Sequence, residues 1–299
     1  MASSTLCILG CGNLGGAILK SLIDGPKDKQ GSAPFTRFIA CVRSQESEQR
    51  LTTQFSHQSQ SLTVTRDIIK AVQESDVVVL GVDPAVVEKV LSTPSLKEAL
   101  SNKLLISVAA GWTRQKLETT LYGSPTTTSN AEGRAWVVRT LPNIAASVSQ
   151  GLTAIEISEP EVPEHYQKIT DAVFDNLGKT VHIPPTLMDA TTAVAGSTPA
   201  FFAVIVDAMI DAAVAVGVPR DLARTMTVQA MTGTAALLQS GMHPAVLRDQ
   251  GTSPEGCTIG GLMVMEEAGV RGHVGRALRE AVTIARLMDG TRHLNDTRQ

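Results

Sequence analysis

The chain has 299 residues, of which 43% are hydrophobic, 18% charged and 3% aromatic, and its formal net charge is −3. At roughly 100–200 residues per domain, this length predicts two domains. The hydrophobic content excludes a disordered chain and permits a large core. The slight acidic excess, the lack of a dense Lys/Arg run and the few aromatic side chains argue against nucleic acid as a partner.

The cysteine content indicates a reducing environment. The four cysteines are Cys7, Cys11, Cys41 and Cys257, and no pair has the spacing of a zinc site. Four in a chain of this length do not make a disulfide framework, so a reducing compartment, the cytoplasm, is expected. The histidines form no H-x-x-x-H pair, and no metal site is predicted.

No membrane association is expected. The N-terminus has neither a basic region nor a long apolar region, so no signal peptide is predicted. The most apolar window covers residues 199–218, and Asp207 and Asp211 interrupt it four residues apart. The window therefore predicts a buried helix or a subunit interface, and not a membrane span.

The first half of the chain alternates short apolar runs with segments of helical spacing. We expect strands at 5–9, 38–42, 62–64, 76–82, 104–109 and 136–140, with a weaker run at 152–157 that closes the sheet. Helices are expected between them at 13–24, 46–55, 67–74 and 86–91. Because these runs lack strict polar alternation and are separated by helices, they predict a parallel sheet covered on both faces.

The pattern changes after Glu159. Pro160 and Pro163 mark a linker or a helix start, and a helix is expected at 166–177 and a strand at 180–183. The Ala-rich remainder predicts helices at 186–216, 222–239, 243–250, 259–269 and 274–287. We therefore expect an α/β protein with a doubly wound N-terminal domain over residues 1–160 and an all-helical C-terminal domain over residues 161–299.

A glycine motif directly follows the first expected strand. Gly10, Gly12 and Gly15 have the spacing G-x-G-x-x-G and open the first helix. Gly10 permits a tight turn, Gly12 lets the backbone approach a pyrophosphate, and Gly15 allows close packing of helix and strand. The helix N-terminus at Asn13 and Leu14 then faces the phosphates. An ordinary glycine turn has the same composition, but the strand–turn–helix context favours a Rossmann-type NAD(P)-binding domain.

The end of the second expected strand bears on the choice of cofactor. An acid there binds the ribose 2′-hydroxyl of NAD, whereas this chain has Arg43 and Ser44. Arginine and serine side chains can hold a 2′-phosphate. NADPH is therefore the predicted cofactor, and NADH is the alternative. In that alternative Arg43 is a solvated side chain at the end of the strand with no role in cofactor binding.

Several stretches of the second half resemble the motifs of pyrroline-5-carboxylate reductases. TTAVAGSTPAF at 191–201 resembles T-A-L-S-G-S-G-P-A-[YF], HPAVLRD at 243–249 resembles H-P-x-x-L-[KR]-D, and SPEGCTIGGL at 253–262 resembles S-P-G-G-T-T-I-x-G-L. In the first half, 104–112 and the Pro142–Asn143 pair also fit. The resemblance runs from about residue 5 to 288 in the order that the family has.

The resemblance implies an activity and an assembly. Members of this family pass a hydride from NAD(P)H to the imine carbon of Δ1-pyrroline-5-carboxylate, a small cyclic imine, and form L-proline. It also implies that the helical domain is a dimerisation and substrate domain that interlocks into a homodimer, and that such dimers commonly assemble into decamers. A protonated imine is already electrophilic, so the protein mainly has to position it against the nicotinamide.

The resemblance also assigns residues. Thr258 matches the threonine whose hydroxyl approaches the imine nitrogen, so it is the predicted catalytic residue; a simple helix N-cap is the alternative. The predicted substrate-binding residues are Ser253, Gly256, Cys257, Thr258 and Ser197. Ser197 either contacts substrate or caps a helix break. The segments matched to the cofactor site add Val82, Asp83, Pro84, Ala109, Ala110, Gly111 and Asn143 to the glycine loop, Arg43 and Ser44.

The chain departs from the family motifs at these places. Thr198 replaces a glycine, Ile144 and Ala145 replace the threonine and proline of P-N-T-P-A, and Asp83 replaces a lysine beside the cofactor. Glu255 replaces the first glycine of S-P-G-G; it repels an anionic substrate if it points inward, or faces solvent and favours the helix N-terminus. We interpret these changes as a shifted substrate, such as an alkylated pyrroline carboxylate, with Δ1-pyrroline-5-carboxylate itself as the simpler possibility.

Two other classes of protein fit parts of this pattern. β-Hydroxyacid dehydrogenases share the two-domain plan but use a lysine on the long helix after the sheet. Residues 188–218 contain no lysine or arginine, which argues against that class. The other alternative is a non-catalytic NADP-binding scaffold, which the departures permit and which the intact glycine loop, Asn143 and Thr258 oppose.

Overall fold

The computed structural model describes residues 4–24, 35–58, 60–127 and 133–288. The described residues divide into two compact units. The first unit runs to Gly196 and includes the residues from Val282 on, and the second unit is Ser197–Ala281.

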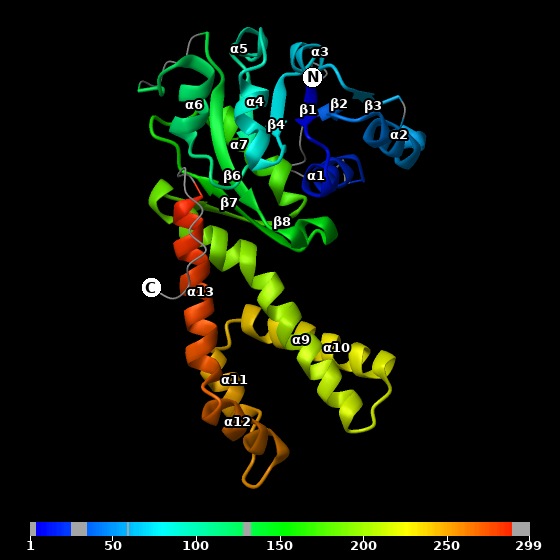
Figure 1. The fold of residues 1–299 in the computed structure, drawn as a ribbon, viewed down its shortest axis with the longest axis vertical. Helices are drawn as coiled ribbons and strands as arrows, with labels where there is room; N and C mark the ends of the chain where they lie inside the picture. The colour runs from blue at the N-terminus through cyan, green and yellow to red at the C-terminus, as the bar shows by residue number, and fades with distance from the viewer. Residues whose placement is uncertain (1–3, 25–34, 59, 128–132, 289–299) are drawn as a thin grey trace. The chain divides into compact units, whose positions relative to one another are not determined.

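The first unit is built on one eight-stranded sheet in the order β3-β2-β1-β4-β5-β6-β7-β8 (Figure 1). The strands are β1 Ser4–Leu9, β2 Phe35–Cys41, β3 Leu62–Thr65, β4 Val77–Leu80, β5 Leu104–Ser107, β6 Trp136–Pro142, β7 Gly151–Glu156 and β8 Gly178–Ile183. The chain runs outward from β1 in one direction and then, from β4 on, in the other. This is the doubly wound arrangement that the sequence predicts.

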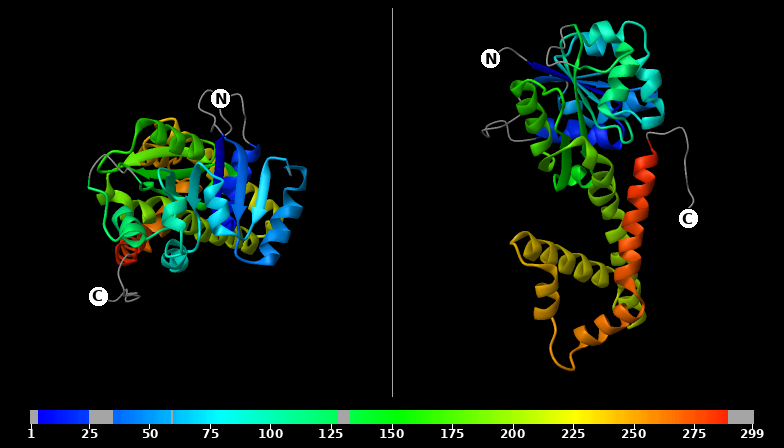
Figure 2. Two further views of the ribbon diagram at one scale, coloured as in Figure 1. Left: turned by 90° about the horizontal axis from the view of Figure 1, so that it is seen from above. Right: turned by 90° about the vertical axis from the view of Figure 1, so that its left-hand side faces the viewer.

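Helices cover both faces of this sheet, as Figure 2 shows. They are α1 Asn13–Asp24, α2 Gln45–Gln54, α3 Ile68–Gln73, α4 Val87–Leu91, α5 Leu96–Ala99, α6 Arg114–Tyr122 and α7 Glu164–Asp175. Alternate residues of β1 enter two different cores: Leu6 and Ile8 pack in one, and Cys7 and Leu9 in the other. A strand buried on both faces reads as a continuous apolar run, which explains why the strand signals lack alternation.

Two predicted details of the sheet are wrong, namely that all strands are parallel and that the run at 152–157 closes the sheet. β7 pairs antiparallel with β6. The two strands are joined by a short connection that contains the 3₁₀ helix Ile144–Val148, and only an antiparallel pair can be joined by so short a connection. β8 then pairs parallel with β7 and forms the edge. The sheet is therefore mixed, and β8, not β7, ends it.

The predicted boundary near residue 160 falls inside the first unit. Pro160 lies against α6, where its carbonyl oxygen accepts from Arg114 at 3.1 Å. Arg114 in turn pairs with Glu118 at 2.8 Å, and both side chains are buried. Phe174 of α7 is fully buried in the core. The prolines near 160 thus mark the loop that leads into α7 and β8, and not a linker between compact units.

The predicted long helix at 186–216 is present with a change of geometry. It consists of the 3₁₀ turn Pro185–Leu187, α8 Met188–Thr191, a π-helical stretch Thr192–Ser197 and α9 Thr198–Ala215. By length and composition this helix could cross a membrane. The aspartates at 207 and 211 interrupt its apolar run, and the sequence predicts a buried helix or a subunit interface there.

The second unit contains helices only. They are α9, α10 Arg220–Gln239, α11 Pro244–Gln250, α12 Cys257–Glu267 and the greater part of α13 Val270–Leu287. Large apolar side chains stay exposed on these helices in the single chain, among them Val204 at 70% and Val264 at 65%. Apolar surface of this extent is typical of a face that another protein chain covers.

Candidate active site

The glycine motif forms a tight turn between β1 and α1. Gly10 has a φ of +96°, and its amide donates to the Cys41 carbonyl oxygen at 2.9 Å. A Cβ on Gly10 would lie 2.7 Å from the Val82 amide nitrogen, and a Cβ on Gly15 would overlap the Gly10 carbonyl oxygen. Both glycines are therefore required by the fold itself.

Gly12 differs from its two partners. Apart from its chain neighbours, no atom of the residues that the structure describes lies within 4 Å of the position that a Cβ on Gly12 would take, and Gly12 is exposed. The fold thus leaves open space above this backbone, directly before the N-terminus of α1. The free amides and the positive end of a helix dipole at that position favour an anion such as a pyrophosphate.

The thiol within this loop is unreactive. Burial, and to a lesser extent the neighbouring Cys41, raise the pKa of Cys11 to about 12, although Arg50 acts in the opposite direction. Since a thiolate is the nucleophilic form, Cys11 supplies no nucleophile at neutral pH. This agrees with a site that needs no thiol chemistry.

Two arginines follow β2 beside the glycine loop. Arg43 is exposed, and no described residue forms an ion pair or hydrogen bond with its side chain. Ser44 is the N-cap of α2, and its hydroxyl oxygen accepts a hydrogen bond from the Ser47 amide at 3.1 Å. Part of the hydrogen-bonding capacity of this hydroxyl is therefore used within the fold. Arg50 donates to the Cys11 carbonyl oxygen at 3.3 Å. Arg50 is not predicted from the sequence, because nothing in its spacing places it against the loop.

We expect Arg43→Ala to raise the Michaelis constant for NADPH by roughly 10- to 100-fold, the range that one charge-assisted hydrogen bond supplies. The constant for NADH should change little, since that cofactor has no 2′-phosphate. Steady-state kinetics with both cofactors measures the effect. Arg37→Ala is the control, because Arg37 lies on β2, the strand that Arg43 follows, and pairs with Glu74. Equal losses with both cofactors would contradict a 2′-phosphate role.

The remaining predicted cofactor residues gather at one edge of the sheet. Val82, Asp83 and Pro84 follow β4, Ala109, Ala110 and Gly111 follow β5, and Asn143 follows β6. Because β1, β4, β5 and β6 are parallel neighbours, their carboxyl ends meet at the edge where the glycine loop lies. Ligands of doubly wound sheets bind at this edge.

Two of these side chains are engaged within the fold. The Asp83 carboxylate accepts from the Ala85 amide at 2.8 Å and caps a 3₁₀ turn. The Asn143 amide nitrogen donates to the Ala195 carbonyl oxygen at 2.9 Å, and its oxygen accepts from the Leu152 amide at 3.3 Å. The Asn143 side chain thus ties the end of β6 to the π-helical stretch.

The predicted substrate loop is a tight turn in the second unit. The Gly256 amide donates to the Ser253 carbonyl oxygen at 3.0 Å, with Pro254 and Glu255 between them. Gly256 is the N-cap of α12, and a Cβ on it would lie 2.5 Å from the Ser253 hydroxyl oxygen. Glycine is therefore needed for the close approach of Ser253.

Thr258 lies in the first turn of α12. The alternative reading of Thr258 as an N-cap is wrong, because Gly256 occupies the cap position. The Thr258 side chain is exposed, and no described residue forms a hydrogen bond with its hydroxyl. Ser197 likewise forms no capping hydrogen bond at the start of α9. Both hydroxyls are thus available to a ligand.

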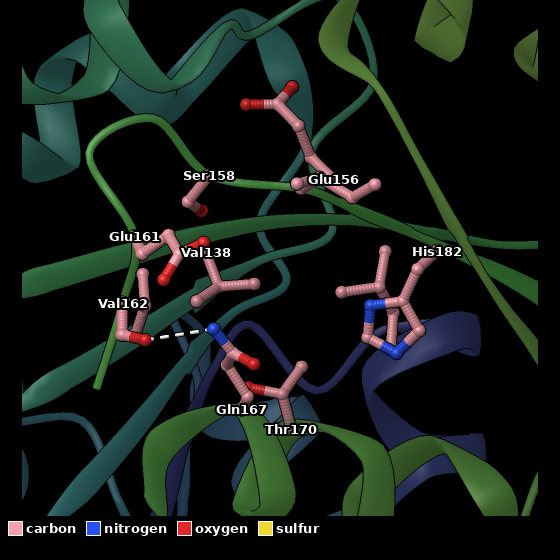
Figure 3. Close-up of a pocket in the computed structure, with 10 residues that line it drawn as sticks. Val138, Glu156, Ser158, Glu161, Val162, Gln167, Thr170 and His182 are labelled. Carbon is pink, nitrogen blue, oxygen red and sulfur yellow. Dashed lines mark hydrogen bonds between the residues drawn. The ribbon is translucent and has the colours of Figure 1, made fainter. Parts of the chain in front are cut away.

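A separate cavity of about 150 Å³ lies in the first unit, between α7 and the strands β6 to β8 (Figure 3). Ser158, Glu161, Gln167 and His182 are among its lining residues, and Gln167 donates to the Val162 carbonyl oxygen at 2.8 Å. None of the predicted site residues lines this cavity. Among the residues that the structure describes, no group of three or more His, Cys, Asp or Glu side chains has the arrangement of a metal site.

Two family models match the chain. One, described as pyrroline-5-carboxylate reductase dimerisation, covers residues 185–288, and the other, described as NADP oxidoreductase, coenzyme F420-dependent, covers residues 5–111. The second range contains the glycine loop, and the first contains α9 to α13. Together with the doubly wound sheet, they define an NAD(P)H-dependent oxidoreductase with a helical dimerisation domain.

Individual proteins make the identification narrower. The chain is 40% identical to a pyrroline-5-carboxylate reductase of Lophium arboricola, over 98% of this chain and 96% of that protein. It is 35% identical to a pyrroline-5-carboxylate reductase of Neurospora crassa, over the same shares. A Plasmodium falciparum pyrroline carboxylate reductase with NADP bound has the same fold, with a TM-score of 0.80, 23% identity, and coverage of 97% of this chain and 100% of that one. The chain therefore belongs to the pyrroline-5-carboxylate reductase family, oxidoreductases that act on a C=N bond.

Proposed function

We propose that this chain reduces the ring C=N bond of Δ1-pyrroline-5-carboxylate, or of a closely related ring that carries a small substituent, to the corresponding proline. The observation that carries the proposal is the free hydroxyl of Thr258 in the first turn of α12, next to an anion-binding helix N-terminus. Family membership supports the reaction class.

The glycine loop fits the expected cofactor, because the open space above Gly12 is what close approach of a pyrophosphate requires. When bound, NADPH supplies the hydride. In this proposal Gly10 shapes the turn, its own amide being bonded to the Cys41 carbonyl oxygen, and the backbone amides of Gly12, Asn13 and Leu14 hold the pyrophosphate. Arg43 and Ser44 hold the 2′-phosphate, with Arg50 as a second nearby cation. The residues after β4, β5 and β6 line the rest of the cofactor site.

The substrate loop has two tasks. The Cys257 amide and the Ser253 hydroxyl hold the substrate carboxylate at the N-terminus of α12, while Gly256 keeps the turn through its bond to the Ser253 carbonyl oxygen. Ser197 adds a hydroxyl. Thr258 hydrogen-bonds the imine nitrogen, which orients the ring and keeps the proton there while the neighbouring carbon is reduced. Orientation is the main contribution that an already electrophilic iminium needs.

A substituted ring is the second candidate, and the departures around the site support it. Ile144 is 72% exposed at the start of the connection after β6, and Thr198 begins α9 directly after Ser197. Thr198 is larger than the glycine it replaces, and Ile144 is more apolar than the threonine it replaces. Each therefore changes the shape or polarity of its surroundings. Several changes at positions that the family motifs assign to cofactor or substrate binding favour a different ligand over neutral drift.

The test is NADPH oxidation followed at 340 nm with the purified protein. Δ1-Pyrroline-5-carboxylate, substituted homologues and the six-membered analogue are offered in parallel, with NADH as the cofactor control. We expect turnover of at least one of these imines. NADPH binding without turnover of any of them would overturn the proposal and support the non-catalytic scaffold.

We also propose the assembly and the location. The exposed apolar side chains of α9 to α13 belong to the segment that matches the dimerisation family, which supports a homodimer through the helical domain. Further assembly into a decamer follows the family expectation, and sedimentation velocity measures it. The four cysteines are free thiols, which is consistent with a cytoplasmic location.

A further inference from the structure

The cavity of about 150 Å³ in the first unit contains a buried hydroxyl without a partner. It lies between α7 and the strands β6 to β8, and Ser158, from the loop after β7, is part of its lining (Figure 3). Ser158 is 7% exposed, and no described residue forms a hydrogen bond with its hydroxyl. Because an unpaired buried polar group destabilises a fold, this hydroxyl indicates a partner that the described chain does not supply.

Other polar groups around the cavity offer hydrogen-bond acceptors. Gln167 donates its amide nitrogen to the Val162 carbonyl oxygen at 2.8 Å, which leaves its Oε1 for another donor. His182 bonds through Nε2 to the Asp171 carboxylate at 2.8 Å. Since an ionised carboxylate only accepts, Nε2 carries the proton, and Nδ1 of the neutral imidazole is an acceptor. Figure 3 shows Nδ1 on the side of the ring that faces the cavity.

A carboxylate lies at the mouth of the cavity. Glu161 is exposed, and no described residue forms an ion pair or hydrogen bond with it. Figure 3 shows its carboxylate on the same side of the cavity as the Ser158 hydroxyl. Glu156 also belongs to the lining, but its carboxylate points away and pairs with Arg139 at 3.4 Å. None of the lining residues is a lysine or an arginine, so the Glu161 charge has no cation beside it in the cavity.

The rest of the wall is aliphatic. Val138 of β6, Ile155 of β7 and Val162 are buried and line the cavity. An apolar cavity of comparable volume holds a molecule of about six heavy atoms. The lining therefore fits a small ligand that has a positively charged hydrogen-bond donor at one end and an aliphatic body at the other.

We propose that this cavity binds a small aliphatic ammonium compound, with the ammonium group held by Ser158 and Glu161 and the alkyl group against the aliphatic wall. An ammonium group donates three hydrogen bonds and accepts none, which matches the acceptors present. The predicted cofactor and substrate residues are absent from the lining, so the site is separate from the candidate active site. The proposal does not depend on imine reduction.

The test is isothermal titration calorimetry of the purified protein with n-butylammonium, butan-1-ol and butanoate. These probes are similar in size and carry a positive charge, no charge and a negative charge. We expect n-butylammonium to bind at least about 10-fold more tightly than butan-1-ol, the lower end of what a hydrogen bond to a charged group supplies, and butanoate not to bind. No binding of n-butylammonium would overturn the proposal, as would equal affinity for the ammonium and the alcohol.

Variants then place the ammonium group in the cavity. Ser158→Ala and Glu161→Gln should each weaken n-butylammonium binding by about 5-fold or more, the effect of one hydrogen bond. Ser158→Ala should also melt slightly higher, because it removes an unpaired buried hydroxyl. Glu164→Gln is the matched control, since it removes an exposed carboxylate from the first turn of α7, outside the lining, and should leave the affinity unchanged. Weaker binding in Thr258→Val would place the amine in the imine site and overturn the proposal.

Discussion

Gly12→Ala is expected to weaken NADPH binding by at least about 100-fold while the protein stays folded. The added methyl group meets no protein atom within 4 Å, so the fold accommodates it. It enters the space where the backbone must approach the pyrophosphate, and the amides there can no longer reach the phosphate oxygens. The loss of two hydrogen bonds between backbone amides and the charged phosphates weakens the free energy of NADPH binding by about 3 kcal/mol or more. Fluorescence titration of NADPH measures the affinity, and thermal unfolding of the apoprotein reports on the fold.

Gly16→Ala is the matched control. Gly16 is four residues further on in α1, and its Cβ position is also free of contacts. Alanine in a helix interior is about 0.5–1 kcal/mol more stable than glycine, so this variant should bind NADPH normally and melt slightly higher. Gly15→Ala should instead destabilise the protein strongly, because its Cβ overlaps the Gly10 carbonyl oxygen. Normal NADPH affinity in a folded Gly12→Ala protein would show that the cofactor does not lie over this loop.

The sequence was sufficient for the order and type of most elements of the first unit. Runs such as Val77–Leu80 are apolar on both faces, and the helices between them have capping residues such as Asp67 and Thr113. These signals are local. The strand partners of β7 and β8 depend on long-range pairing and on the length of a connection, so the antiparallel step and the true edge strand were not predictable from the local pattern.

In the candidate site, too, local signals were predictable and tertiary contacts were not. Residue spacing and family motifs predict which residues gather at the carboxyl edge of the sheet. The contacts of individual side chains were not predictable, because they depend on tertiary packing. Arg50 reaches the glycine loop from α2, Asn143 is engaged with the π-helical stretch, and Glu255 takes a left-handed conformation. The position of the boundary between units failed for a related reason: prolines mark loops within a unit as readily as linkers between units.

Thr258→Val is expected to lower kcat about 100-fold or more, the lower end of what a positioned proton-handling group contributes. Valine keeps the shape and the β-branch of threonine, so α12 retains its start and only the hydroxyl is lost. Thr258→Ser keeps the hydroxyl and should stay within several-fold of the wild type. NADPH affinity should be unchanged in both variants, because the glycine loop and Arg43 are intact.

The comparison of valine with serine separates chemistry from packing. A hydroxyl that serves only the helix would leave a stability effect in Thr258→Val and no effect on kcat. Thr234→Val is the matched control: that hydroxyl bonds to the Ala230 carbonyl oxygen on exposed α10, so its removal should leave kcat unchanged. Wild-type kcat in Thr258→Val would refute the assigned role. Because no described residue engages the Thr258 hydroxyl, a loss in kcat with unchanged cofactor affinity and melting temperature places that hydroxyl on the reacting imine.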